Sequence, residues 1–241
     1  MLRLEWSLYL AAIAAMIFAL WAQFKVRSTF KKYSAEPMLR GRLAYEVAEM
    51  ILRTNGIYDV RIERVRGSLT DHYDPRNKVL RLSDSVFASA SAAAVGVAAH
   101  EAGHAVQYAK GYLPVKIRSA LVPAASFSSK FTWVLLMAGI LFMFVKPNST
   151  TGLYMVLAGV GLFAVATLFQ LVTLPCEFNA SRRAMAALSG SGWYSPEELR
   201  GSRRVLTAAA LTYVAALALS AIQLLRLLIY VARISGRGRN R

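Results

Sequence analysis

Four long runs without a charged residue limit the fold of this chain more than any other feature of its sequence. They cover residues 6–24, 131–145, 153–174 and 205–225. A transmembrane helix needs about 20 apolar residues to cross a bilayer. The whole chain is 56% hydrophobic and 17% charged, whereas an average soluble domain is about 45–50% apolar and about 25% charged. The sequence therefore predicts a mainly α membrane protein with about four transmembrane helices.

Two of these runs differ from a typical transmembrane segment, one in length and the other in its place at the N-terminus. The run 131–145 reaches a workable length only if residues 127–130 extend it and Lys130 reaches back to the membrane surface. The first run follows a basic residue and resembles a cleaved signal peptide. However, no clear small-residue cleavage site precedes Lys25, and three further runs follow. We therefore predict a first transmembrane helix, and a hairpin formed by the second and third runs.

The net charge of +16 comes from 29 basic and 13 acidic residues. Such an excess suits nucleic acid or an anionic membrane surface, and the apolar composition favours the membrane, with no nucleic acid as a partner. Basic clusters follow the first run and lie between the third and fourth runs. The positive-inside rule places both clusters in the cytoplasm. With four spans the Arg-rich tail after residue 225 then lies outside, so either the last run fails to cross or the larger clusters dominate.

A small α+β domain is predicted for residues 26–125, between the first two spans. Its expected elements, from apolar periodicity and turn residues, are a helix from about Pro37 to Asn55-Gly56, strands at 58–63 and 79–82, and a helix from about 85 to 110. Ser83 and Asp84 are candidate caps of the second helix. The other predicted segments are a first helix (1–25), the hairpin (126–174), a connecting segment (175–204) and a last helix with its basic tail (205–241).

The second helix of this domain contains the sequence His100-Glu101-Ala102-Gly103-His104. Residues four apart lie on one helix face, so both imidazoles can reach one metal ion while Glu101 projects towards bound water. Zinc held in this way makes water more acidic, and Glu101 is then the general base. The five-residue pattern alone is only moderately specific, but polar groups in an apolar helix need partners. The sequence therefore predicts a zinc site and peptide hydrolysis. It also predicts a zincin-like domain in which a short sheet precedes the helix that carries the two histidines.

Glu177 is the predicted third metal ligand, because no Asp or Glu occurs between Glu101 and this position. The later pair Glu197-Glu198 stands where acids ordinarily stabilise a helix start. Cys176 is a rival ligand, since thiolate binds zinc well, although a lone cysteine beside a span is more often a small apolar residue. As the only cysteine, it excludes a disulfide framework.

Four further polar residues are weaker candidates for the site. Asn179 and Ser181 could orient a ligand through hydrogen bonds, or face solvent on a helix. His72 could line the cleft or steady the oxyanion, although a histidine in a turn is the commoner case. Tyr213 could donate a hydrogen bond to the same oxyanion, and its alternative is an aromatic residue at the membrane interface.

The sequence resembles the YugP-type membrane zinc metallopeptidases of bacteria. The resemblance rests on residues 69–75 (LTDHYDP), 100–107 (HEAGHAVQ), 169–184 (FQLVTLPCEFNASRRA) and 205–216 (VLTAAALTYVAA). It implies a multi-pass inner-membrane protease with a zinc site on the cytoplasmic side. By the same resemblance His100 and His104 are zinc ligands, Glu101 is the catalytic acid and Glu177 is the third ligand. Cys176 and Asn179 depart from the Val and Asp expected at these positions.

The favoured interpretation is a membrane-embedded zinc endopeptidase acting on a protein or peptide substrate. In this reading Leu80 and Leu82 belong to an edge strand that pairs with extended substrate. Two alternatives also fit the sequence. A non-catalytic scaffold would bind anionic lipid or partner proteins and hold its metal in a closed four-ligand site, and an iron oxygenase would use an open facial triad. The sequence says nothing about the oligomeric state.

Overall fold

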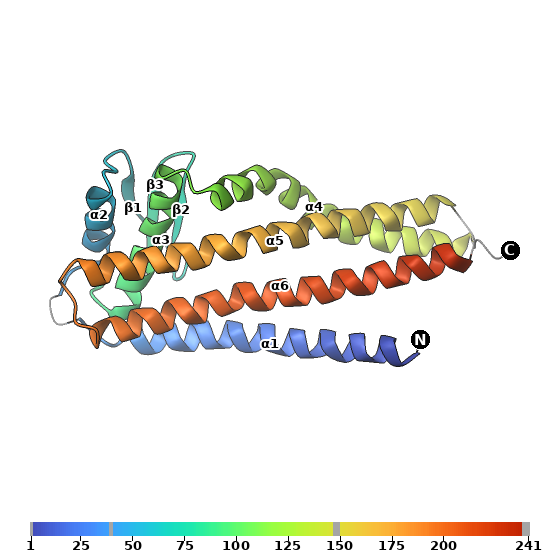
Figure 1. The fold of residues 1–241 in the computed structure, drawn as a ribbon, viewed down its shortest axis with the longest axis horizontal. Coiled ribbons are helices and arrows are strands. Elements are labelled where there is room, and N and C mark those ends of the chain that lie inside the picture. Colours follow the sequence, from blue (N-terminus) through green and yellow to red (C-terminus); the bar gives the residue numbers. More distant parts are fainter. Residues whose placement is uncertain (1, 39–40, 147–149, 238–241) are drawn as a thin grey trace. The chain divides into compact units, whose positions relative to one another are not determined.

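The computed structural model describes residues 2–38, 41–146 and 150–237, which contain six helices and one three-stranded sheet (Figure 1). In chain order the elements are α1 Leu2–Ser34, α2 Ala44–Thr54, β1 Arg61–Val65, β2 His72–Asp74, β3 Val79–Ser83, α3 Ala92–Ala109, α4 Leu113–Val145, α5 Thr150–Gly190 and α6 Glu198–Arg237. Helices α1, α4, α5 and α6 are each long and apolar enough to span a membrane. The prediction of a mainly α membrane protein with four spans and a small sheet is confirmed.

The chain divides into two compact units. The helical unit consists of Met1–Ala19, Ile117–Thr173 and Val214–Arg241, and the mixed unit consists of Leu20–Lys116 and Leu174–Tyr213. Each of the four long helices contributes residues to both units. Their lengths of 33 to 41 residues exceed the about 20 residues that a bilayer requires. Each long helix thus supplies a membrane span and also a part of the mixed unit.

In the helical unit, α4 and α5 pack as an antiparallel pair through glycine. A Cβ atom at Gly139 would lie 2.8 Å from the carbonyl oxygen of Gly152, and one at Gly159 would lie 2.8 Å from the Leu136 side chain. Glycine at these positions lets two membrane helices approach closely. The hairpin predicted for the second and third runs agrees with this pairing, while the turn residues 147–149 fall outside the described residues.

The sheet of the mixed unit has the strand order β1-β3-β2, with β1 parallel and β2 antiparallel to β3. Leu80 pairs with Ile62 on one side and Tyr73 on the other. Both Leu80 and Leu82 are fully buried. The prediction that they form an edge strand is therefore wrong, because the short polar strand β2 covers that side of β3.

Two helix starts also differ from the predictions. Helix α3 begins at Ala92, and its cap is Ser91, whose hydroxyl accepts a hydrogen bond from the Ala94 N–H. Ser83 and Asp84 do not cap it, because their side chains bond within the sheet and its loops, to Asp71 and to Arg64 and Gly67. Helix α2 begins at Ala44, whereas Pro37 forms an isolated bridge with Ser91. Leu39, counted in the predicted helix, lies outside the described residues.

The start of the first strand differs from its prediction, whereas the ends of α2 and α3 lie close to theirs. Strand β1 starts at Arg61, three residues later than predicted, because Tyr58 is exposed and Asp59 pairs with Lys78. Helix α2 ends at Thr54, just before the predicted Asn55-Gly56 stop. Helix α3 ends at Ala109, followed by Gly111 with a φ of +64°, a conformation that favours glycine.

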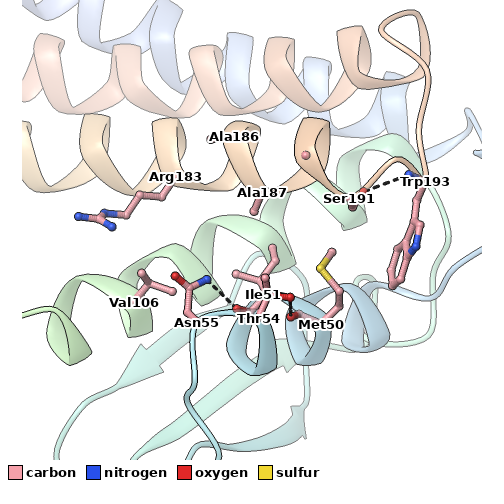
Figure 2. Close-up of a pocket in the computed structure, with 11 residues that line it drawn as sticks. Met50, Ile51, Thr54, Asn55, Val106, Arg183, Ala186, Ala187, Ser191 and Trp193 are labelled. Carbon is pink, nitrogen blue, oxygen red and sulfur yellow. Dashed lines mark hydrogen bonds between the residues drawn. The ribbon is translucent and has the colours of Figure 1, made fainter.

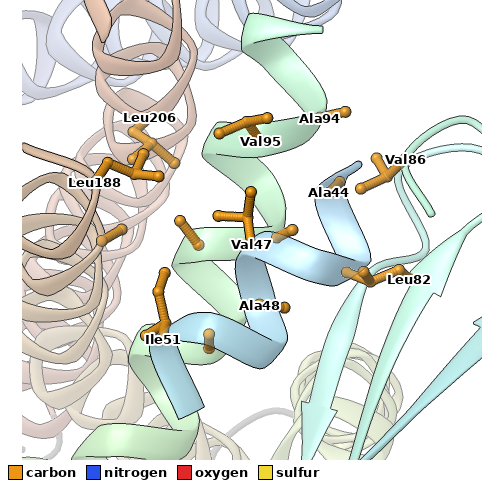
Figure 3. Packing of buried hydrophobic residues seen from close by; sticks show 14 of the residues in the cluster. Ala44, Val47, Ala48, Ile51, Leu82, Val86, Ala94, Val95, Leu188 and Leu206 are labelled. Carbon is orange, nitrogen blue, oxygen red and sulfur yellow. The ribbon is translucent and has the colours of Figure 1, made fainter. Parts of the chain in front are cut away.

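The core of the mixed unit forms where α2 and α3 pack against each other, and both helices also contact the sheet (Figure 3). Val47 and Ile51 of α2 pack with Val95 of α3 and with Leu188 and Leu206 of the long helices. The apolar spacing of three and four residues in α2 places these side chains on one face. Burial of this face fixes α2 and, through it, the position of α3.

Candidate metal centre

Three side chains from two helices converge in the mixed unit. His100 and His104 lie one turn apart on α3, and Glu177 lies on α5. Oε2 of Glu177 is 3.2 Å from Nε2 of His100 and 3.5 Å from Nε2 of His104. One nitrogen or oxygen from each of the three residues lies within 4.8 Å of the others. The structure therefore brings together the three residues that the sequence singled out as ligands.

The spacing of these atoms fits a tetrahedral zinc ion. Two ligand atoms bound at about 2.0–2.1 Å with tetrahedral angles are about 3.3 Å apart. The separations of 3.2 and 3.5 Å between Oε2 of Glu177 and the two Nε2 atoms lie on either side of this value. Glu177 is only 2% exposed, and a buried carboxylate is costly unless it is paired or binds a metal. The donor set, two imidazoles and one carboxylate, is one that zinc uses.

A glycine inside the His-Glu motif permits this convergence. A Cβ atom on Gly103 would lie 2.7 Å from the main-chain oxygen of Ala180, closer than real side chains approach. Because residue 103 is glycine, the backbone of α3 packs directly against α5 at this point. This close approach brings His100 and His104 near Glu177. Small residues give α3 a second close contact, since the Ser202 hydroxyl of α6 donates a 2.6 Å hydrogen bond to the Ala92 carbonyl.

Both histidines of the candidate site are held through the second ring nitrogen, Nδ1. Nδ1 of His104 lies 3.0 Å from Oε1 of Gln107, and Nδ1 of His100 lies 3.1 Å from the Ser181 hydroxyl. Such contacts orient an imidazole and leave Nε2 available for a metal. Ser181 was a sequence candidate for this role, whereas Gln107 was not. The sequence feature that could have identified Gln107 is its position, three residues after His104 and on the same helix face.

Asn179 contacts the site indirectly, through Gln107. Its Oδ1 accepts hydrogen bonds from Nε2 of Gln107 at 3.0 Å and from Nε of Arg183 at 2.7 Å. Gln107 also donates to the main-chain oxygen of Cys176, at 2.7 Å. Cys176 therefore contributes its carbonyl group to this network, and its sulfur does not belong to the group of converging ligand atoms.

Glu101 lies between the two histidines in α3 and is partly exposed. In the part of the chain that the structure describes, no hydrogen bond or ion pair engages its carboxylate. Asp71, in the loop before β2, accepts hydrogen bonds from the Ser83 N–H and hydroxyl. Burial raises the pKa of Asp71, and the negative charge of Glu101 raises it further. The two carboxylates are thus close enough to influence each other.

Two of the weaker sequence candidates do not join the converging ligand atoms. His72 is exposed on β2, where its Nδ1 donates to the Thr70 carbonyl at 2.8 Å and its Nε2 lies 3.3 Å from Nη1 of Arg81. These contacts hold the ring on the sheet. Tyr213 lies on α6 and is 37% exposed. Neither Glu197 nor Glu198 joins the group, and Glu198 instead accepts the Ser195 N–H at the start of α6.

A cavity of about 490 Å³ lies beside the C-terminal part of α5, close to the segment that carries Glu177 and Asn179. Figure 2 shows it between α2 and the last turns of α5, with Met50 and Trp193 at one end and Arg183 at the other. Val106 of α3 also lines it. Arg183 is thus shared between the cavity and the network around Gln107.

Comparisons with known proteins also point to zinc. A family model described as "Putative neutral zinc metallopeptidase" matches residues 8–232. The chain belongs to this zinc metallopeptidase family. It is 43% identical over 228 residues to "Putative membrane protease YugP" of Bacillus subtilis (strain 168), covering 95% of this chain and 97% of that protein. No solved structure matches this chain. Zinc is the cofactor of the family, and His100, His104 and Glu177 form the candidate site for it.

Proposed function

We propose that this family member is a membrane-embedded endopeptidase that hydrolyses peptide bonds in protein or peptide substrates, with zinc held by His100, His104 and Glu177. The observation that carries the proposal is the convergence of these three side chains beside Glu101. The name of the Bacillus relative, a membrane protease, supports the same activity and the same setting.

The chain's own residues divide the chemistry between them. When bound, zinc polarises the scissile carbonyl group and makes a water molecule more acidic. Glu101 accepts a proton from the attacking water as the new C–O bond forms. Glu101 then donates this proton to the amine nitrogen as the C–N bond breaks. Ser181 and Gln107 keep the two imidazoles oriented throughout, through their contacts with Nδ1.

The donor set supports catalysis over a structural metal. A closed site has four protein ligands, whereas a catalytic site keeps one position open. Among the described residues the converging group has three members, and the sulfur of Cys176 is not one of them. An iron facial triad has the same number of ligands, but it has no use for a general base at Glu101.

Glu101→Gln tests the mechanism most directly. The neutral amide has nearly the same shape but cannot accept the proton, so we expect casein or peptide cleavage to fall by about 10²–10⁴-fold while zinc content stays unchanged. Wild-type protein treated with a chelator should also lose activity, and added zinc should restore it. Cleavage by Glu101→Gln at the wild-type rate would overturn the mechanism. A zinc-loaded wild-type protein that cleaves no peptide would favour the scaffold interpretation.

We further propose that the mixed unit faces the cytoplasm of a bacterial inner membrane. It contains both basic clusters, the one around Lys31 and Lys32 and the one around Arg203 and Arg204, and such clusters stay inside. Tyr58, which is 80% exposed, offers a test. In Tyr58→Cys on a Cys176→Ala background, a membrane-impermeant maleimide should label the thiol only after the cells are opened. Labelling in intact cells would place the unit outside.

A further inference from the structure

Gln107 is the most deeply buried polar side chain beside the candidate metal centre. It is fully buried, and its amide group has three hydrogen-bonding contacts. One of them fixes the orientation of the amide. The main-chain oxygen of Cys176 can only accept a hydrogen bond, so Nε2 of Gln107 must face it. Oε1 of Gln107 then necessarily faces His104.

This orientation determines where His104 carries its proton. Because Oε1 of Gln107 can only accept, Nδ1 of His104 must carry the hydrogen of the 3.0 Å contact. A neutral imidazole with its proton on Nδ1 has its lone pair on Nε2. That nitrogen is the one that faces Glu177. The opposite tautomer would place a proton where the metal must bind.

The orientation of Gln107 is itself fixed from α5. Asn179 Oδ1 accepts from both Gln107 Nε2 and Arg183 Nε. An arginine can only donate, so the oxygen of Asn179 must lie on this side. Cys176, Asn179 and Arg183 are spaced by three and four residues, which places them on one face of α5. Each member of the network therefore has a defined donor or acceptor role.

We propose that Gln107 is a positioning residue for the zinc ligand His104, and that Asn179 and Arg183 hold Gln107 in its working orientation. This inference rests on the proposed function, because it assumes that His104 binds zinc. It also defines what position 179 requires, namely an acceptor for two donors. Aspartate meets this requirement as well as asparagine, and leucine does not.

The test is the zinc dissociation constant of the detergent-purified full chain, measured by competition with a chelator. Gln107→Leu should weaken zinc binding about 10–100-fold, the range found when a hydrogen-bond partner of a metal ligand is lost. Asn179→Leu should weaken it less, and Asn179→Asp should stay within about threefold of wild type, since outer partners act only through Gln107. Cobalt substitution gives a second readout, because the visible spectrum should change in Gln107→Leu and remain unchanged in Asn179→Asp.

Controls separate the possible failures. Gln170→Leu removes another glutamine contact, with the Ser220 hydroxyl in the helical unit, and should leave the zinc affinity unchanged. His104→Ala should abolish tight binding. If it does, a folded Gln107→Leu with wild-type affinity and spectrum overturns the positioning role alone. If His104→Ala binds zinc normally, the ligand set of the proposed function fails. Should Gln107→Leu not fold, Asn179→Leu decides, and wild-type affinity there also overturns the inference.

Discussion

The two units use parts of the same four helices but pack them in different ways. In the helical unit large apolar side chains point outward, as Leu141 and Phe144 do at 63% and 84% exposure, and its small buried cluster consists of Leu136, Val156 and Val160. In the mixed unit the apolar side chains form one continuous core with α2, α3 and the sheet. The outward-facing surface of the helical unit is suited to lipid, whereas the mixed unit has a core typical of a water-soluble domain.

This difference explains where the candidate metal centre lies. A catalytic site needs side chains held within about 0.5 Å of their working positions. The mixed unit meets this need with direct backbone contacts, such as that of Gly103 with Ala180, and with a fully bonded polar network around Gln107. Matched substitutions in the two units test this difference.

Truncating a leucine gives the largest expected contrast. Leu80→Ala removes a fully buried side chain from β3 and should lower the free energy of unfolding by about 2–5 kcal/mol. Leu141→Ala, on the outer face of α4, should change it by less than about 0.5 kcal/mol. Unfolding by denaturant in detergent micelles measures both. Equal losses would break the comparison, and would mean that the face carrying Leu141 is buried against another protein surface.

Adding one methyl group to a glycine should give effects of opposite sign. Gly103→Ala forces α3 away from Ala180 and should cost about 1–3 kcal/mol, with at least tenfold weaker zinc binding, because both histidines move relative to Glu177. A Cβ atom on Gly161 of α5 meets nothing within 4 Å, so Gly161→Ala should stabilise its helix by about 0.5–1 kcal/mol. Thermal unfolding and chelator competition test the pair. Normal zinc binding by Gly103→Ala would show that the close approach is not required.

The sequence predicted the parts of this molecule that depend on local spacing. The four spans follow from uncharged runs, and the face shared by His100 and His104 follows from helix geometry. Glu177 stood out because acids are absent between it and Glu101. The helix starts and the strand order depend on contacts distant in sequence. Ser83 resembles a helix cap, but its partner is Asp71, and that bond cannot be read from neighbouring residues.

Gln107 was missed for a related reason. A glutamine is neither a usual zinc ligand nor a titratable group, and its role emerges only when α5 presents the Cys176 carbonyl and Asn179 to it. The edge-strand error has the same origin. Strand β2 is three residues long and polar, so its sequence is typical of a turn, and only its pairing makes β3 the central strand.

Unpartnered buried hydroxyl groups give the smallest expected effects. Among the described residues, the hydroxyls of Tyr194 in the mixed unit and Thr132 in the helical unit are buried without a hydrogen-bond partner. Tyr194→Phe should raise the free energy of unfolding by about 1 kcal/mol, because an unsatisfied buried group has a desolvation penalty. Thr132→Val should have a smaller effect, since in a membrane the unfolded reference state is also surrounded by apolar groups. Denaturant unfolding at neutral pH measures both changes.

The pH dependence of stability tests the surroundings of Tyr194 separately. Burial raises its pKa to about 12, and the nearby charge of Glu198 adds to this effect, whereas an unfolded tyrosine titrates at about 10. The folded state thus favours the protonated phenol, and this contribution is complete below about pH 10 and is lost as the pH rises through about 12. Tyr194→Phe should therefore lose less stability than wild type between pH 9 and 12. Identical alkaline profiles would mean that water reaches the Tyr194 hydroxyl, and that the core of the mixed unit is less tightly closed than its packing indicates.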